Sequence, residues 1–199
     1  MPLESAVKKS LAGDKIAVLA KRLAAGDMSA CDTFCKELDC HNPKLIWTPD
    51  LNTMPLSGMN WLYEWWLDKK GDDLAPSAKY IQPEELISVL GYLMILEPDA
   101  NEMDFFIRLY GSKIQSQSGK DMTNQKVSET WTPLRGFFLI TYQAICQRKE
   151  AMLTYHSPPE DVNVTAWHRL ILPFIDDGKV SRILVAIYPT QRQEVTQLY

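Results

Sequence analysis

The chain has 199 residues, of which 46% are apolar and 23% are charged, a composition typical of a folded, soluble protein. That length suits one domain with an extension. The net charge is −4, and Lys and Arg are not clustered as phosphate binding requires, so DNA and RNA are excluded as expected partners. No apolar run approaches the roughly 20 residues that cross a bilayer, and the N-terminus lacks the apolar core of a secretory signal. We therefore expect a cytoplasmic protein that does not associate with membranes.

Residues 1–45 are predicted to form an N-terminal helical extension. Within it, apolar residues recur at helical spacing over residues 3–25, around a break at Gly13 and Asp14, which favours one or two helices. Residues 32–38 can add another short helical turn.

An extended connector at residues 46–58 is predicted to lead into the main domain. The stretch from residue 41 to residue 58 holds three prolines and few periodic apolar positions, which is typical of a connector. A helix follows at residues 59–69, with a broad apolar face formed by Trp61, Leu62, Trp65 and Trp66. Pro83 then opens a second helix, which Gly91 ends.

Five strands and one long helix are predicted in the rest of the domain. Short β-branched and aromatic runs at residues 92–99 and 103–111, joined by a hairpin-type turn, favour two antiparallel strands. A helix is predicted over residues 128–149, with Ser128 as its N-cap. Three more strands are predicted at residues 151–157, 165–175 and 181–189, and an Asp-Gly turn joins the last two.

These elements predict an α+β fold with a five-stranded antiparallel sheet, flanking helices and the N-terminal helical extension. We place the domain at residues 59–189 and a C-terminal tail at residues 190–199. Two strands, short helical turns, one long helix and three strands follow each other in the order of a PAS domain.

Several motifs carry the same resemblance. They are the tryptophan-bearing helix at residues 61–66, the Pro-x4-Ile-x-Pro segment from Pro76 to Pro83, the aromatic-x-Arg-Leu-x-Gly strand from Phe106 to Gly111, the Gly-x-Asp-Met-Thr turn from Gly119 to Thr123, and Leu172-Pro173. Over residues 59–189 the chain resembles the single-PAS regulatory proteins common in alphaproteobacteria.

The resemblance implies a PAS-like fold used for sensing or for protein interaction, with no single ligand to carry over from the family. It also implies structural roles for Gly111, Gly119, Asp121 and Thr123. Asn124 stands where the family pattern has glycine. Because asparagine tolerates a left-handed backbone better than most residues, we expect the turn to survive this change.

Arg108 lies inside the second predicted strand. Side-chain alternation predicts one apolar face, formed by Phe105, Ile107 and Leu109, and one mixed face that holds Phe106, Arg108 and Tyr110. Arg108 can present its donor fork to a carboxylate-bearing ligand between the sheet and the long helix, or it can pair with Asp121 or another acid and brace the Gly119 loop. We favour the brace, because a half-buried arginine in a sheet commonly has an internal partner.

Aromatic and polar-tipped side chains near a pocket between the sheet and the long helix are the candidate ligand contacts. They are Arg108, Tyr110, Trp131, Tyr142, Trp167, His168 and Arg169. Alternation over residues 165–175 predicts that His168 points inward with Leu170, Leu172 and Phe174, whereas Trp167 and Arg169 share the opposite face. Since most aromatic residues at such spacings only form core, a core role is favoured for each.

The sequence does not identify a cofactor. His156 and His168 are the candidate haem ligands in the domain, but neither sits in a haem motif, and Cys146 lies late in the long helix for a flavin-reactive cysteine. Haem and flavin are therefore not favoured. Cys31, Cys35, Cys40 and His41 offer soft ligands at a spacing that does not match common zinc motifs, so we predict no metal site.

Catalysis is not predicted, because no nucleophile elbow, phosphate-binding loop or zinc-protease helix is present in the sequence. Asp176 and Asp177 are read as solvated hairpin residues rather than a catalytic pair. We expect a non-catalytic sensor or adaptor with a small apolar or amphipathic ligand, an unidentified protein partner and a possible homodimer. The helix at residues 59–69 and residues 3–25 are candidates to cover the second sheet face. The alternative is a ligand-free scaffold for protein interaction.

Overall fold

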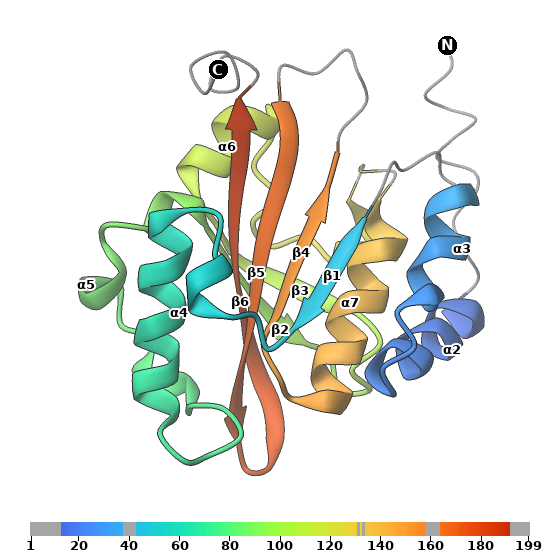
Figure 1. Ribbon diagram of the computed structural model, residues 1–199, viewed down its shortest axis with the longest axis horizontal. Helices are drawn as coiled ribbons and strands as arrows, with labels where there is room; N and C mark the ends of the chain where they lie inside the picture. The colour runs from blue at the N-terminus through green and yellow to red at the C-terminus, as the bar shows by residue number, and fades with distance from the viewer. Residues whose placement is uncertain (1–12, 38–42, 131, 133, 158–163, 192–199) are drawn as a thin grey trace.

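A six-stranded antiparallel sheet forms the centre of the structure (Figure 1). The computed structural model describes residues 13–37, 43–130, 132, 134–157 and 164–191. The strand order is β1-β4-β5-β6-β2-β3. The strands are β1 (Lys44–Trp47), β2 (Leu93–Pro98), β3 (Phe105–Tyr110), β4 (Met152–His156), β5 (Val164–Asp176) and β6 (Lys179–Gln191). The predicted α+β fold with an antiparallel sheet and flanking helices is therefore confirmed.

Two hairpins, β2–β3 and β5–β6, build most of the sheet. β5 and β6 are joined at Asp177 and Gly178, whose φ angles of 50° and 75° suit the left-handed turn that an Asp-Gly pair favours. β2 pairs with β3 and also with β6. Because β5 and β6 each have 13 residues, they form the long centre to which the outer strands attach.

The sheet has one strand more than predicted. β1 spans the boundary between the predicted extension and the predicted connector, and it pairs with β4 from Lys44 opposite Tyr155 to Trp47 opposite Met152. Its side chains alternate between exposed and half-buried, which is typical of an edge strand. Four residues carry too short a pattern to predict a strand, and pairing with β4 decides their conformation.

One face of the sheet is covered by α4 (Ser57–Lys70), the predicted tryptophan-bearing helix (Figure 1). Met59, Leu62, Tyr63 and Trp66 recur at helical spacing and are buried. The indole nitrogen of Trp66 donates to the Pro173 carbonyl at 2.9 Å. The predicted apolar face is wrong at Trp61, whose side chain is 39% exposed, because Tyr63 takes that place in the core.

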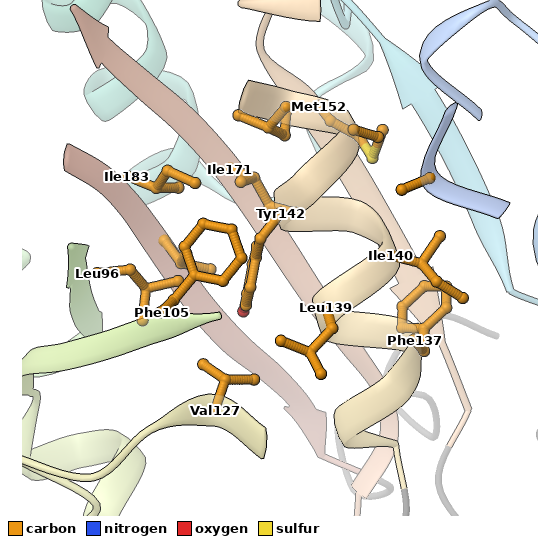
Figure 2. Close-up of a cluster of buried hydrophobic side chains, with 14 of the residues drawn as sticks. Leu96, Phe105, Val127, Phe137, Leu139, Ile140, Tyr142, Met152, Ile171 and Ile183 are labelled. Carbon is orange, nitrogen blue, oxygen red and sulfur yellow. The ribbon is translucent and has the colours of Figure 1, made fainter. Parts of the chain in front are cut away.

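The other face is covered by α7 (Arg135–Arg148), which begins at Arg135 rather than at Ser128. Ser128 lies in the preceding 3-10 turn η4 (Val127–Glu129), where its hydroxyl donates to Asp104 at 2.6 Å, so its predicted N-cap role is wrong. Most of the circumference of α7 is buried. Figure 2 shows Leu139 and Tyr142 projecting on the side of Phe105, with Ile140 on the opposite side of the helix.

Two N-terminal helices pack against α7. They are α2 (Gly13–Ala24) and α3 (Ser29–Glu37), and Figure 1 shows α7 between them and the sheet. Ile16, Leu19, Ala20 and Leu23 form the buried face of α2. The expectation that this segment covers the sheet is wrong for α2, because α7 already occupies that face. Residues 3–12 and most of the predicted tail lie outside the described residues.

Short helical segments connect the larger elements. α5 (Pro83–Leu86) begins at its proline as predicted but ends at Leu86, and a separate 3-10 turn, η3 (Leu90–Tyr92), completes the segment. The other segments are the 3-10 turns η1 (Leu51–Thr53) and η2 (Ala78–Tyr80) and the helix α6 (Ser112–Ser118).

Leu23→Ala should lower the free energy of unfolding by about 2–5 kcal/mol, because a fully buried leucine on α2 leaves a cavity beside α7. Val18 lies on the same helix and is 60% exposed, so Val18→Ala should change that free energy by less than about 0.5 kcal/mol. Urea titration of the full chain measures both variants. Similar small losses in the two would show that α2 does not stabilise the α7 layer.

Candidate functional site

The layer between the sheet and α7 holds four of the predicted ligand contacts, of which Arg169 is described below with its polar neighbours. Tyr142 is buried on α7, and Tyr110 and Trp167 are half-buried side chains that pack against the same core. Tyr142 lies edge-on to Phe105, with ring centroids 5.5 Å apart (Figure 2). Trp131 lies outside the described residues.

A β-bulge changes the predicted alternation in β3. Ile107 pairs with Leu96 and Leu109 pairs with the adjacent Ile95, so Arg108 is the extra residue between them. The predicted grouping of Leu109 with Phe105 and Ile107 is therefore wrong. Leu109 packs against the core on the α4 side of the sheet, whereas Tyr110 packs against the core on the α7 side.

Arg108 is paired with an acid on the neighbouring strand. Its Nε donates to Glu97 at 2.9 Å, and Arg182 lies 3.1 Å from the same carboxylate. The hydrogen bond from Arg108 is the main cause that lowers the pKa of Glu97. Arg108 therefore pairs with Glu97 and not with Asp121, the acid that was named from the sequence. Because the Arg108 side chain is 46% exposed, the pair contributes little to stability.

The Gly-x-Asp-Met-Thr motif forms a turn beside the edge of β3. Asp121 accepts hydrogen bonds from the hydroxyl and the backbone N–H of Thr123, at 2.7 and 2.9 Å, and both lower the pKa of Asp121. Gly119 ends α6 with a φ of 73°. Asn124 has a φ of 65°, so the predicted tolerance for a left-handed backbone is used here. Its N–H donates to the Ile107 carbonyl and extends the pairing of β3.

Gly111 lies where two backbone segments touch. A Cβ on Gly111 would overlap the carbonyl group of Gly91, which is part of the backbone and cannot rotate away. The Gly111 N–H donates to the Leu93 carbonyl at 2.9 Å and fixes this close approach. The glycine that ends the strand motif is therefore needed because a residue with a side chain does not fit there.

His168 faces the α4 side of the sheet, on the same face as Leu170 and Leu172. Its Nε2 lies 2.9 Å from the Thr190 hydroxyl, and its ring lies 5.2 Å from that of Tyr155. It lines a hollow of about 170 Å³ together with Lys44, Ile46, Pro55, Leu153 and Tyr155. That volume is below the roughly 300–1,000 Å³ of typical ligand pockets.

A buried polar cluster lies on the α7 face of the sheet. We call it the Arg169 cluster, and its members are Tyr142 on α7, Thr154 and His156 on β4, and Arg169 on β5. Thr154 is directly opposite Arg169, and His156 is opposite Trp167, so the strand residues share one face. The Arg169 side chain is 7% exposed, and its Nη2 donates to the Tyr142 hydroxyl at 2.8 Å.

Three polar atoms of the Arg169 cluster have no hydrogen-bond partner in the part of the chain that the structure describes. They are Arg169 Nε, His156 Nδ1 and Thr154 Oγ1, and they make up three of the five such buried side-chain atoms among the described residues. Burial is the main cause that lowers the pKa of His156 to about 3, and the nearby Arg169 charge adds to it. The imidazole is therefore neutral near pH 7. Burial also raises the pKa of Tyr142.

The sequence pointed to part of this cluster. Alternation along β5 correctly predicted that Trp167 and Arg169 share a face, and Tyr142 and Arg169 were both candidate contacts. Thr154 was missed, because a threonine in a strand is ordinary. The register between β4 and β5, which brings Thr154 opposite Arg169, is the signal that would have found it.

The chain also matches a known family. A PAS domain family model matches residues 54–188, which is more than half of the chain. The chain belongs to the PAS domain family. PAS domains are in general sensory, non-catalytic modules, so this membership indicates a sensory or signalling role. The match begins after β1 and therefore does not include α2 or α3.

Searches among curated proteins and solved structures found no match. In the described part of the PAS protein, no helix combines the length and apolar character needed to cross a bilayer.

The cysteines of the PAS protein are buried where they are described. Cys31 and Cys35 on α3 and Cys146 on α7 belong to one core cluster, and burial raises the pKa of the Cys146 thiol. Cys40 and His41 lie outside the described residues. Among the residues that the structure describes, no group of three or more His, Cys, Asp or Glu side chains is placed to hold a metal ion.

Gly111→Ala should destabilise the PAS domain by about 1–3 kcal/mol or more, because the added methyl group would overlap the Gly91 backbone. Gly119→Ala meets no atom within 4 Å, and its positive φ should cost only about 1 kcal/mol. Thermal and urea unfolding of both variants provide the comparison. A larger loss for Gly119→Ala would contradict the close approach at Gly111.

The stability of the PAS domain should fall as the pH drops below the unfolded histidine pKa of about 6.5, because the folded pKa of His156 is about 3. Between these values the unfolded chain binds the extra proton, so acid favours unfolding. The free energy of unfolding of the wild type should fall by about 1 kcal/mol between about pH 6 and pH 5 because of His156. The His156→Gln variant should not show this loss.

His168→Gln is the matched comparison. Burial also lowers the pKa of His168, so this histidine too makes the folded protein less stable in acid. Urea titrations at the two pH values measure each slope. The same pH slope in the wild type and in His156→Gln would mean that His156 ionises freely in the folded state.

Proposed function

We propose that this PAS domain is a non-catalytic sensor or adaptor in signal transduction. A small apolar or amphipathic molecule binds between the sheet and α7 and biases the N-terminal helices or a dimer surface. A ligand shifts such an equilibrium only by the difference between its affinities for the two states. It must therefore contact an element that also contacts the output surface.

The burial of α7 on two sides is the observation that supports this proposal. On one side, Tyr142 and Phe138 contact Arg169 of the sheet, and on the other side α2 packs along the helix. A molecule that displaces Tyr142 or Phe138 acts on α7 directly. Because interiors are close-packed, a displaced α7 must alter its contacts with α2.

Tyr142, Tyr110 and Trp167 are the proposed ligand contacts, since all three pack in the layer between the sheet and α7. Trp131 remains a prediction of the same kind. Arg108 and His168 project from other surfaces, so we assign them to the Glu97 ion pair and to the hollow beside β1.

A ligand-free scaffold for protein interaction is the second candidate function. The packing favours it, because Phe105, Phe137 and Tyr142 are fully buried and fill the layer under α7. An unidentified protein or a second copy of the chain would then bind to an outer surface. In both cases we propose a cytoplasmic protein, with residues 46–58 as the connector between the extension and the domain.

Native mass spectrometry of the purified full chain should show one small molecule per chain that is released on unfolding. Hydrogen exchange should then be faster in α2 and α7 of the ligand-free protein, because loss of the ligand loosens the layer that both helices share. Exchange in α4, on the other face, is the internal control and should not change. A consistently empty protein would favour the scaffold.

A further inference from the structure

Arg169 carries a buried positive charge that no acid of the described chain balances. Its side chain is 7% exposed, and among the described residues no Asp or Glu lies within ion-pair distance of it. An unpaired charge in a core is strongly unfavourable. Other described arginines are paired with carboxylates. These are Arg22, Arg108, Arg148 and Arg182.

The contacts that Arg169 does make leave its charge only partly compensated. The guanidinium carbon lies 3.8 Å from the centroid of the Phe138 ring, a cation–π contact, and Nη2 donates to the Tyr142 hydroxyl. Nε is buried and has no acceptor among the described residues. The hydroxyl of Tyr142 accepts this one hydrogen bond, and its own hydrogen can serve an additional acceptor.

Neighbouring side chains add two further unsatisfied polar atoms to the same place. Thr154 and His156 lie on the same face of β4, are at most 4% exposed, and each has a buried polar atom without a partner. Polar atoms buried in native structures are nearly always hydrogen-bonded. Arg169 Nε can only donate, so its unpaired state indicates a missing acceptor, to which the Thr154 hydroxyl can also donate. That acceptor must approach from the α7 side of the sheet.

We propose that the Arg169 cluster binds the carboxylate of a small monoanion whose apolar body lies against Phe138 and Trp167. A carboxylate is planar and matches the guanidinium fork, with Tyr142 and Thr154 as additional donors. One buried cation balances one negative charge, which disfavours phosphate and dicarboxylates. The inference rests on the sensor function proposed above and assigns the ligand class of its site.

The surroundings define the rest of the ligand and its approach. Phe138 and Trp167 are half-buried, whereas Arg169 and His156 are buried, so the two aromatic rings form the outer wall of the cluster. Phe138 lies directly over the guanidinium. Rotation of this ring uncovers Arg169 and moves a side chain of α7, which joins binding to the helix that α2 contacts.

Benzoate is a suitable probe of this site, and benzamide is its neutral match. Benzoate should raise the melting temperature of the full-length protein with increasing concentration, because it binds the folded state. Benzamide and inorganic phosphate should raise it much less. In ¹H–¹⁵N spectra, benzoate should shift the Nε signal of Arg169 and leave that of Arg108 unchanged.

Variants separate the charge from the packing. Arg169→Gln should weaken benzoate binding by about tenfold or more, and Tyr142→Phe, which keeps the ring, by about two- to tenfold. Arg108→Gln is the control, because Arg108 is exposed and paired with Glu97. It should leave benzoate binding unchanged. Calorimetric titration measures the affinities, and the wild-type comparison of benzoate with benzamide does not depend on any variant folding.

Three outcomes would overturn the inference, and they are distinct from failure of the sensor function. Equal responses to benzoate and benzamide would show an apolar site without charge recognition. Unchanged affinity in both Arg169→Gln and Tyr142→Phe would place the benzoate elsewhere. A neutral molecule retained on the purified protein, with no response to benzoate, would support sensing and exclude the carboxylate.

Discussion

The burial of α7 on both sides is the constraint on which the rest of the structure depends. A helix with almost no polar face needs two apolar partners, and the sheet can be only one of them. α2 supplies the other through Ile16, Leu19 and Leu23. Each such side chain contributes about 1.5–3 kcal/mol when fully buried, so the N-terminal helix is part of the folded unit and not an appendage.

The two faces of the sheet are built differently, and the proposed ligand site lies on only one of them. Along β5, Leu170 and Leu172 point to α4 and join an apolar core, whereas Arg169 points to α7 and joins a polar cluster. Adjacent residues of one strand thus serve stability on one side and the proposed ligand site on the other. The proposed relay to α2 requires the second side, because α7 is the helix that both the cluster and α2 contact.

The elements whose conformation depends on local residues were predicted from the sequence. Those whose conformation depends on pairing with a distant segment were missed. The β5–β6 hairpin was predicted correctly because the Asp-Gly turn needs no outside partner. β1 was missed because its four residues become a strand only beside β4. The bulge at Arg108 has no local signal, and it reversed the face of Leu109. The periodicity of α2 predicted that one face is buried, but not that α7 would cover it.

Stability does not explain why position 169 holds an arginine. A leucine or methionine at position 169 would pack in this core without an unpaired charge, and replacing buried ions by apolar residues is often neutral or stabilising. The arginine therefore reduces stability in the core between the sheet and α7. Proteins depart from consistent packing mainly at functional sites, and here the loss falls on the one sheet face whose helix contacts a second layer. No acid of the described residues balances the charge at that position, and the proposed carboxylate ligand would supply the missing negative group.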